Sequence, residues 1–221
     1  MYNIRTGSYK GELYSLNPGE ETIQDLPSYR KVSDLPETDL AFLAIPAKLC
    51  TEVIRELAAT RNTRAFVIVS AGFSEESEEG AGIEREIVEI CNQYGAALIG
   101  PNCIGVMTPG YQGVFTLPVP PLNERGCDFI SGSGATAVFI MESGLQNGLP
   151  FNHMFSVGNS AQTGVEDVLQ YLDETYREGI SSRVKILYLE TIRKPEKLLR
   201  HAVSLIRKGC RIAAVKAGTT E

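Results

Sequence analysis

Short apolar runs alternate with segments of helical period along the first half of the chain. The runs have the length of strands and cover residues 13–16, 40–45, 66–69 and 96–99. Between them, apolar side chains recur every three or four positions in residues 49–57 and 83–94, which predicts helices. Uninterrupted apolar strands are typical of a sheet that is buried on both faces, so the pattern predicts parallel βαβ units.

The same alternation returns in the second half. Strands are predicted at residues 128–130, 154–157, 184–189 and 212–215, and helices at residues 135–147, 165–176 and 195–207. Residues 117–123 contain three prolines and cannot continue a central strand or helix. We therefore expect an α/β protein with two consecutive parallel-sheet domains, residues 1–118 and 127–221, joined by a Pro-rich linker at 119–126.

The composition mainly excludes classes of binding partner and a metal site. The 21 Lys and Arg residues stand against 27 Asp and Glu residues, and the net charge of −6 does not favour nucleic acid or an anionic membrane as a partner. No apolar leader follows Met1, which predicts a cytoplasmic protein. The spacing of His153, His201 and the five cysteines predicts no metal site. The cysteines are expected to be buried, and Cys103 is the one that a crevice could expose.

Loop-forming residues follow each strand predicted in the first half. They are Asn17-Pro18-Gly19, Ile45-Pro46-Ala47, Ser70-Ala71-Gly72-Phe73 and Gly100-Pro101-Asn102-Cys103-Ile104-Gly105. The carboxyl ends of parallel strands share one sheet edge, where loops and helix N-termini bind ligands. Each segment alone is typical of an ordinary turn. Four of them at one edge indicate a ligand crevice.

The turn Ser131-Gly132-Ser133-Gly134-Ala135-Thr136 lies between a predicted strand and a predicted helix. Its glycines permit close approach, and its amides and hydroxyls could form a nest for phosphate. An ordinary βα turn with a serine N-cap explains the same residues, and spacing alone does not separate the two. Glu190 directly follows the predicted strand 184–189. Its carboxylate could orient a ligand group there, or it could simply be a solvated side chain at the end of the strand.

In this order, these motifs resemble those of the nucleoside-diphosphate-forming acyl-CoA synthetases. The resemblance extends over nearly the whole chain. It rests on the segments Asn17-Pro18, Asp34-Leu35-Pro36, Ala44-Ile45-Pro46-Ala47, Ser70-Ala71-Gly72-Phe73-Ser74-Glu75, Gly100-Pro101-Asn102-Cys103-Ile104-Gly105, Ser131-Gly132-Ser133-Gly134-Ala135, Ser156-Val157-Gly158-Asn159, Tyr188-Leu189-Glu190 and Lys216-Ala217-Gly218.

The resemblance implies a Rossmann-like CoA-binding domain followed by a flavodoxin-like CoA-ligase domain, as in succinyl-CoA synthetases. The residues implied to bind CoA are Pro18, Pro46, Ala47, Ser70, Ala71, Gly72, Phe73, Asn102 and Cys103. Ser131, Gly132, Ser133 and Gly134 are implied to hold phosphate. Glu190 is implied to be the catalytic carboxylate that steadies a phosphorylated histidine.

The implied reaction interconverts acyl-CoA, ADP and phosphate with a carboxylic acid, CoA and ATP, through an acyl phosphate and a phosphohistidine. The implied small molecules are therefore CoA, a short-chain acid or its acyl-CoA, and phosphate. ADP or ATP with Mg²⁺ would bind to an ATP-grasp domain or subunit outside this chain. A homo- or hetero-oligomer is expected.

Two parts of the family pattern have no counterpart in residues 1–221, namely the first strand with its Gly-rich CoA turn and the histidine loop. We therefore expect the chain to be part of a longer enzyme and to be inactive alone. Other functions remain open. One is a non-catalytic CoA-binding or regulatory module, such as the CoA-binding part of a fused acetyltransferase. Another is a dinucleotide-binding oxidoreductase, which the absence of a Gly-x-Gly-x-x-Gly turn disfavours.

Overall fold

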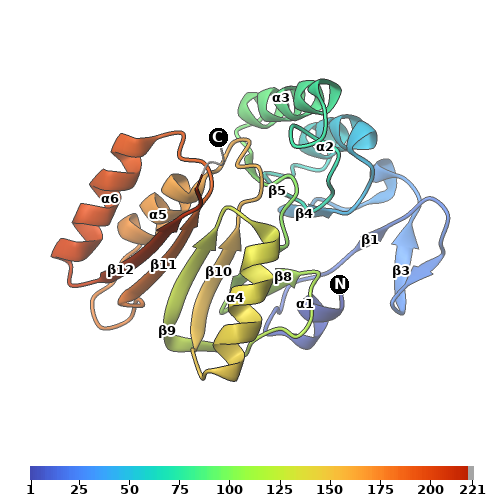
Figure 1. The fold of residues 1–221 in the computed structure, drawn as a ribbon. Coiled ribbons are helices and arrows are strands. Elements are labelled where there is room, and N and C mark those ends of the chain that lie inside the picture. The colour runs from blue at the N-terminus through green and yellow to red at the C-terminus, as the bar shows by residue number, and fades with distance from the viewer. Residues whose placement is uncertain (219–221) are drawn as a thin grey trace.

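The computed structural model describes residues 1–218, whose strands form three sheets (Figure 1). The first half contains α1 (Tyr2–Thr6), β1 (Ser15–Leu16), β2 (Thr22–Ile23), β3 (Leu26–Tyr29), a 3₁₀ turn (Val32–Asp34), β4 (Leu40–Leu43), α2 (Ala47–Thr60), β5 (Ala65–Ile68), α3 (Glu78–Gln93) and β6 (Ala97–Ile99). The rest contains β7 (Gly105–Thr108), β8 (Tyr111–Val114), β9 (Leu122–Ser131), α4 (Gly134–Gln146), β10 (Phe151–Ser156), α5 (Val165–Glu174), β11 (Val184–Leu189), α6 (Pro195–Arg207) and β12 (Arg211–Lys216).

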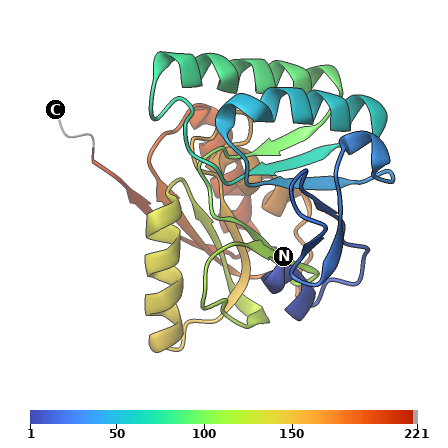
Figure 2. The same ribbon diagram turned by 90° about the vertical axis from the view of Figure 1, so that its right-hand side faces the viewer.

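The first half is built on a parallel sheet with the order β4-β5-β6. Helices α2 and α3 lie side by side over this sheet (Figure 2). Ile54 and Leu57 of α2 and Ile87 of α3 meet Phe66 and Leu98 of the strands in one buried core. The predicted βαβ arrangement is thus confirmed for β4, β5 and β6, because the apolar stripe of each helix has a sheet face to cover.

The strand predicted at residues 13–16 belongs to a different sheet. Only Ser15 and Leu16 pair as β1, and they pair with β3 in a small sheet of order β1-β3-β2. The turn that contains Pro18 therefore follows a strand that is hydrogen-bonded outside the β4-β5-β6 sheet. Four strand ends were expected at one sheet edge. The ends of β4, β5 and β6 share an edge, and the end of β1 does not.

The second half is built on a six-stranded sheet with the order β12-β11-β9-β10-β7-β8. Strands β9 to β12 are parallel to one another. At one side of the sheet, β7 pairs antiparallel with β10, and β8 pairs antiparallel with β7. Helix α4 covers one face, and α5 and α6 cover the other (Figure 1). This is the doubly covered parallel sheet that the apolar strands predict.

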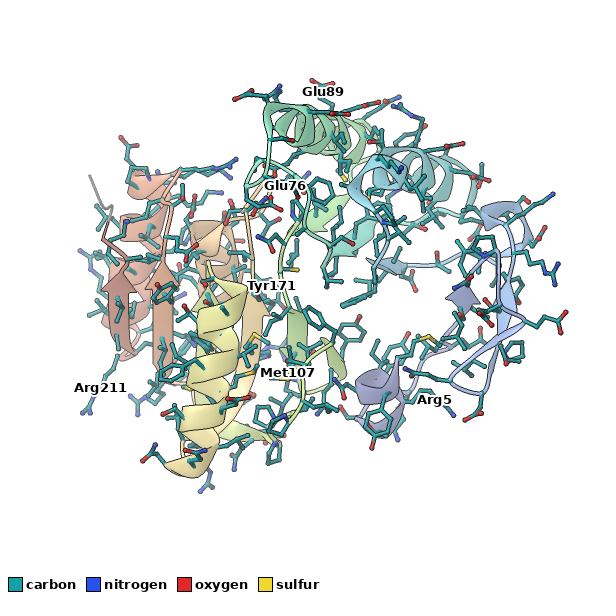
Figure 3. All side chains as sticks on the ribbon, turned by 45° about the vertical axis from the view of Figure 1, so that its right-hand side comes forward. Arg5, Glu76, Glu89, Met107, Tyr171 and Arg211 are labelled. Carbon is teal, nitrogen blue, oxygen red and sulfur yellow. The ribbon has the colours of Figure 1, made fainter. Side chains whose placement is uncertain are left out.

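The expected domain boundary differs from the observed sheets. Residues 105–114, which were expected in the first domain, form β7 and β8, and Met107 of β7 pairs with Met154 of β10. Figure 3 shows Met107 within this second sheet. The expected linker at 119–126 overlaps β9, which begins at Leu122. The polar start of β9 is half-exposed or exposed, so it produces no apolar run in the sequence.

The loop between β10 and α5 lies against the loop that follows β6. The Asn159 and Ala161 amides donate to the carbonyls of Pro101 and Gly100, at 3.0 and 3.2 Å. The Gln162 side chain accepts from the Leu98 amide at 2.7 Å. These bonds join the two halves at the carboxyl ends of their strands, so the two sets of strand-end loops meet. Within residues 1–218, no helix combines the length and apolarity needed to cross a membrane.

Candidate active site

A cleft of about 650 Å³ lies where the two halves meet. It is lined by the loops that follow β5, β6, β9, β10 and β11, and by residues that follow β8. Parallel sheets present helix N-termini and unpaired amides at these ends. The cleft is therefore the place in the described chain where both halves can contact one ligand.

The turn between β9 and α4 offers free amides to the cleft. Ser133 is the N-cap of α4, and its hydroxyl accepts from the Thr136 amide at 3.4 Å. The Gly134 and Ala135 amides have no acceptor within residues 1–218. A 13-residue helix directs positive partial charge to this end, so the two amides can bind an anion.

The Ser131 hydroxyl shapes the turn and does not face the ligand. Ser131 is fully buried, and its hydroxyl donates to the Ser133 carbonyl at 2.7 Å. Gly132 donates its amide to the Tyr188 carbonyl at 2.9 Å. The expectation that the serine hydroxyls of this turn face outward is therefore wrong for Ser131, because its hydroxyl is buried and bonds within the turn.

Glu190 lies beside the same turn. A Cβ on Gly132 would stand 3.3 Å from the Glu190 nitrogen, so the glycine lets β11 end against the turn. Glu190 lines the cleft and its side chain is exposed. The buried carboxylate of Glu166 accepts from the amides of Arg193 and Lys194, at 3.2 and 3.0 Å, and so fixes the loop that follows Glu190.

Three residues that were predicted to bind CoA meet at the end of β5. The Ser70 hydroxyl donates to the Ile45 carbonyl at 2.6 Å, which ties β5 to β4. Gly72 has φ +102°, and a Cβ there would lie 3.4 Å from the Ala47 Cβ. The positive φ explains why glycine occupies this position, because other residues are strained there.

The amides of Gly72 and Phe73 are already occupied. Both donate to Glu75 Oε1, at 2.8 and 3.2 Å. Burial alone would raise the pKa of the Glu75 carboxyl, but hydrogen bonds from Asn159 and from these amides outweigh it and lower the pKa. Glu75 therefore carries its negative charge in the position that a bound anion would otherwise take.

Asn159 links the two sides of the cleft. Its side-chain amide donates to Glu75, to the Ser74 hydroxyl at 3.2 Å and to Glu84 at 3.0 Å. Glu84 is buried and also accepts from the Ser74 hydroxyl at 2.6 Å. The Arg193 guanidinium donates to the Asn159 carbonyl at 3.3 Å. The loop after β10 is thus held to the loops before α3 and α6.

Asn102 and Cys103 both line the cleft, but in different ways. Asn102 is exposed, and its amide donates to the Ser70 carbonyl at 3.0 Å. Cys103 is 2% exposed and its thiol contacts the Ile68 carbonyl oxygen at 3.2 Å. Burial raises the pKa of this thiol to about 12. Cys103 is therefore a poor target for alkylation, contrary to the expectation of an exposed crevice thiol.

The structure brings together some of the predicted residues and separates others. Those that line the cleft are Asn102, Cys103, Gly132, Ser133, Gly134 and Glu190. Pro46 and Ala47 form the start of α2, and Ser70, Ala71 and Gly72 follow the end of β5. The Phe73 side chain is fully buried in the first core, so the prediction that it lines a crevice is wrong for the side chain. Pro18 is exposed beyond β1, in the other sheet.

Neither histidine lines the cleft. The His153 Nδ1 atom lies 2.7 Å from Asp128 Oδ1, and the His201 Nδ1 atom lies 2.8 Å from Asp173 Oδ2. Asp128 also pairs with the fully buried Lys185, which joins β9 to β11. Both histidines therefore have structural partners.

Comparisons with known proteins agree with this arrangement. A family model described as "CoA binding domain" matches residues 3–109, and one described as "Succinyl-CoA ligase like flavodoxin domain" matches residues 124–221. The chain belongs to the nucleoside-diphosphate-forming acyl-CoA synthetase superfamily, and it consists of its CoA-binding domain followed by its flavodoxin-like ligase domain.

Individual relatives are ADP-forming acetate–CoA ligases. Acetate–CoA ligase [ADP-forming] I of Archaeoglobus fulgidus is 34% identical over all of this chain and 31% of its own length. The α subunit of acetate–CoA ligase [ADP-forming] II of Pyrococcus furiosus is 32% identical over 96% of this chain and 45% of its own length. The chain therefore spans less than half the length of these relatives.

A solved structure has the same fold. The acetyl-coenzyme A synthetase 1 of Ca. Korarchaeum cryptofilum, in complex with phosphate and ADP, matches with a TM-score of 0.84 and 26% identity. The match covers 98% of this chain and 46% of that one.

Proposed function

We propose that this chain is the CoA- and phosphate-binding part of an ADP-forming acyl-CoA synthetase. The observation that carries the proposal is that Asn102 of the CoA-binding half lines the same cleft as Gly134 and Ala135, whose amides have no acceptor within residues 1–218. The names of the relatives support the same activity. CoA would reach the cleft from the ends of β4, β5 and β6.

In the proposed reaction, a phosphate held at the α4 N-terminus attacks the thioester carbonyl of acyl-CoA. A carbon–oxygen bond forms, the carbon–sulfur bond breaks, and CoA leaves as a thiolate that takes up a proton. The product is an acyl phosphate. The two amides at the turn and the α4 dipole stabilise the negative charge of the phosphoryl group throughout.

The later steps need groups from outside residues 1–218. The phosphoryl group would pass to a histidine, with Glu190 orienting that imidazole, and then to ADP bound with Mg²⁺ on an ATP-grasp domain or subunit. Because His153 and His201 do not line the cleft, neither is the proposed acceptor. We therefore expect no acetate-dependent formation of ADP by the 221 residues alone.

Calorimetry on the 221-residue chain tests the proposal. Titrations with CoA and with inorganic phosphate should each give saturable binding, and NAD⁺ should give none. A chain that binds CoA without phosphate would indicate a regulatory CoA-binding module. Binding of NAD⁺ without CoA would indicate a dinucleotide-dependent enzyme, and either result would overturn the proposal.

A further inference from the structure

We propose that Glu190 makes the phosphate site selective for oxyanions that carry a proton. The inference rests on the proposed function, which assigns phosphate to the turn at the start of α4, and it adds a specificity-determining residue. The favoured ligand is hydrogen phosphate. The disfavoured ligands are sulfate and other tetrahedral anions that have no proton to donate at neutral pH.

Glu190 lies directly beside the turn at the start of α4. A Cβ on Gly132 would stand 3.3 Å from the Glu190 nitrogen and 3.6 Å from the Glu190 Cβ atom. Gly132 also donates its amide to the carbonyl of Tyr188, two residues before Glu190, at 2.9 Å. Glu190 is exposed and lines the same cleft as Gly134 and Ala135. Its carboxylate is therefore within reach of a ligand on the two free amides.

The Glu190 carboxylate has no counter-charge in the described part of the chain. It accepts no hydrogen bond there and takes part in no ion pair. Lys216 comes close, but its ammonium donates to the backbone carbonyls of Glu190 and Ala217, at 3.0 and 2.7 Å. Arg193 also lines the cleft, and its guanidinium donates to two backbone carbonyls. Glu190 thus brings an unpaired negative charge next to amides that can bind an anion.

A carboxylate in this position repels a ligand without a proton and accepts a hydrogen bond from a ligand with one. Phosphate keeps at least one proton at neutral pH. Its hydroxyl can donate to Glu190 while its other oxygens accept from the amides of Gly134 and Ala135. Sulfate has the same shape and charge as hydrogen phosphate but no proton, so one of its oxygens would face the carboxylate with no hydrogen between them. Both groups would lose hydration without gaining a partner.

The other carboxylate that lines the cleft sets no such condition. Glu75 accepts from the amides of Gly72 and Phe73 and from the side chain of Asn159. Three donors therefore balance its charge before a ligand arrives. Of the two carboxylates that line the cleft in the described chain, Glu190 is the one that lacks a donor.

The same carboxylate can act at two stages of the proposed reaction. The hydroxyl of phosphate is its donor when phosphate enters, and the N–H of the imidazole is its donor in the later transfer. Sulfate on the turn would block the site, because it cannot yield the acyl phosphate. Rejection of sulfate therefore keeps the turn open for the substrate.

Calorimetry of the 221-residue chain at neutral pH tests the selectivity. The titrants are inorganic phosphate, sulfate and monofluorophosphate, in which fluorine replaces the hydroxyl of hydrogen phosphate. Phosphate should bind at least about tenfold more tightly than either of the others, since they lose a hydrogen bond to a charged group. Monofluorophosphate matches hydrogen phosphate in shape and charge, so its affinity reports the missing donor.

Three variants assign the effect to Glu190, and circular dichroism checks the fold of each. In Glu190→Gln, the side-chain amide can donate to sulfate, and its oxygen can accept from phosphate. Sulfate should therefore bind about tenfold more tightly than to the unmodified chain, and phosphate should change by less than about threefold. Arg193→Gln should weaken both anions by a similar factor, because the loss of a positive charge does not depend on a proton. Glu142→Gln should change neither affinity, since Glu142 is exposed on α4 and does not line the cleft.

The outcomes separate this inference from the proposed function. Equal affinities of the unmodified chain for phosphate and sulfate would overturn the selectivity and leave the proposed function intact. A phosphate-to-sulfate ratio that survives Glu190→Gln would also overturn the inference, because Glu190 would then act through its charge alone or not at all. No binding of phosphate would overturn both.

Discussion

Two turns beside the cleft each present two backbone amides, but the amides are free in one turn and hydrogen-bonded to a carboxylate in the other. At the start of α4, the Gly134 and Ala135 amides have no acceptor within the described chain. At the end of β5, the Gly72 and Phe73 amides both donate to Glu75. The first turn is ready to bind an anion, whereas the second already holds one of its own. An anionic ligand would displace only water from the first turn, but it would compete with a carboxylate at the second.

One asparagine connects the β5 turn to the second half of the chain. Asn159 follows β10 of the second half and donates to Glu75 of the first. The carboxylate that fills the β5 turn is thus one of the groups through which the second half contacts the first. A ligand that moved Glu75 would loosen this contact, so occupancy of the β5 turn and the closeness of the two halves are coupled.

The largest expected effect concerns the contact between the loop after β10 and the loop after β6, which joins the two halves beside these turns. Gly158 has φ +54°, and a Cβ there would clash with the carbonyl oxygens of Pro101 and Asn102, the latter at 2.6 Å. Gly158→Ala should therefore lower the free energy of unfolding by roughly 3 kcal/mol or more. Urea denaturation followed by circular dichroism measures this loss.

A matched glycine separates the clash from backbone strain. Gly148 has φ +70° and no atom within 4 Å of an added Cβ. Gly148→Ala should cost only about 1–2 kcal/mol, the price of a left-handed alanine. Equal losses in the two variants would show that the two loops do not need to approach closely.

The next effect tests the free amides at α4. Gly134 is the first residue of the helix, and proline is tolerated there because its missing N–H is not part of the helix. Gly134→Pro should keep the fold and weaken phosphate binding about tenfold or more, since a hydrogen bond to a charged group is lost. Gly134→Ala keeps the amide and is the control. Unchanged phosphate affinity in the proline variant would show that the Gly134 amide does not bind phosphate. The α4 turn would then not differ from the β5 turn in its readiness to bind an anion.

Much of the fold could be predicted because local signals and the tertiary structure agree. Helix α6 and strand β11 have the predicted bounds, since Pro195 suits the start of a helix and β11 is an apolar run between polar loops. Strands β7 and β8 were missed. Each has four residues, and their antiparallel pairing with the second sheet adds no apolar period to the sequence.

The candidate site could be predicted only where its residues are close in the sequence. The turn Ser131–Gly134 is one continuous segment with a recognisable composition, and Glu190 stands at the end of an apolar strand. The contact between Asn159 and Glu75 joins residues 84 positions apart. It depends on how the two halves pack, and neither residue type by itself indicates that packing.

The smallest expected effect is a change in the acid sensitivity of folding. The pKa of Glu75 is lowered in the folded protein, so the stability that this carboxylate contributes is present above its unfolded pKa and is lost as the pH falls through the folded value. Glu75→Gln should therefore lose less stability than the unmodified chain between pH 7 and pH 3.5. Because the side chain is exposed, the difference should stay below about 1 kcal/mol. Glu76→Gln is the control, since this neighbouring carboxylate accepts no hydrogen bond from the described residues and should not alter the pH dependence. If both variants follow the unmodified chain in urea titrations at the two pH values, the carboxylate does not hold the β5 turn.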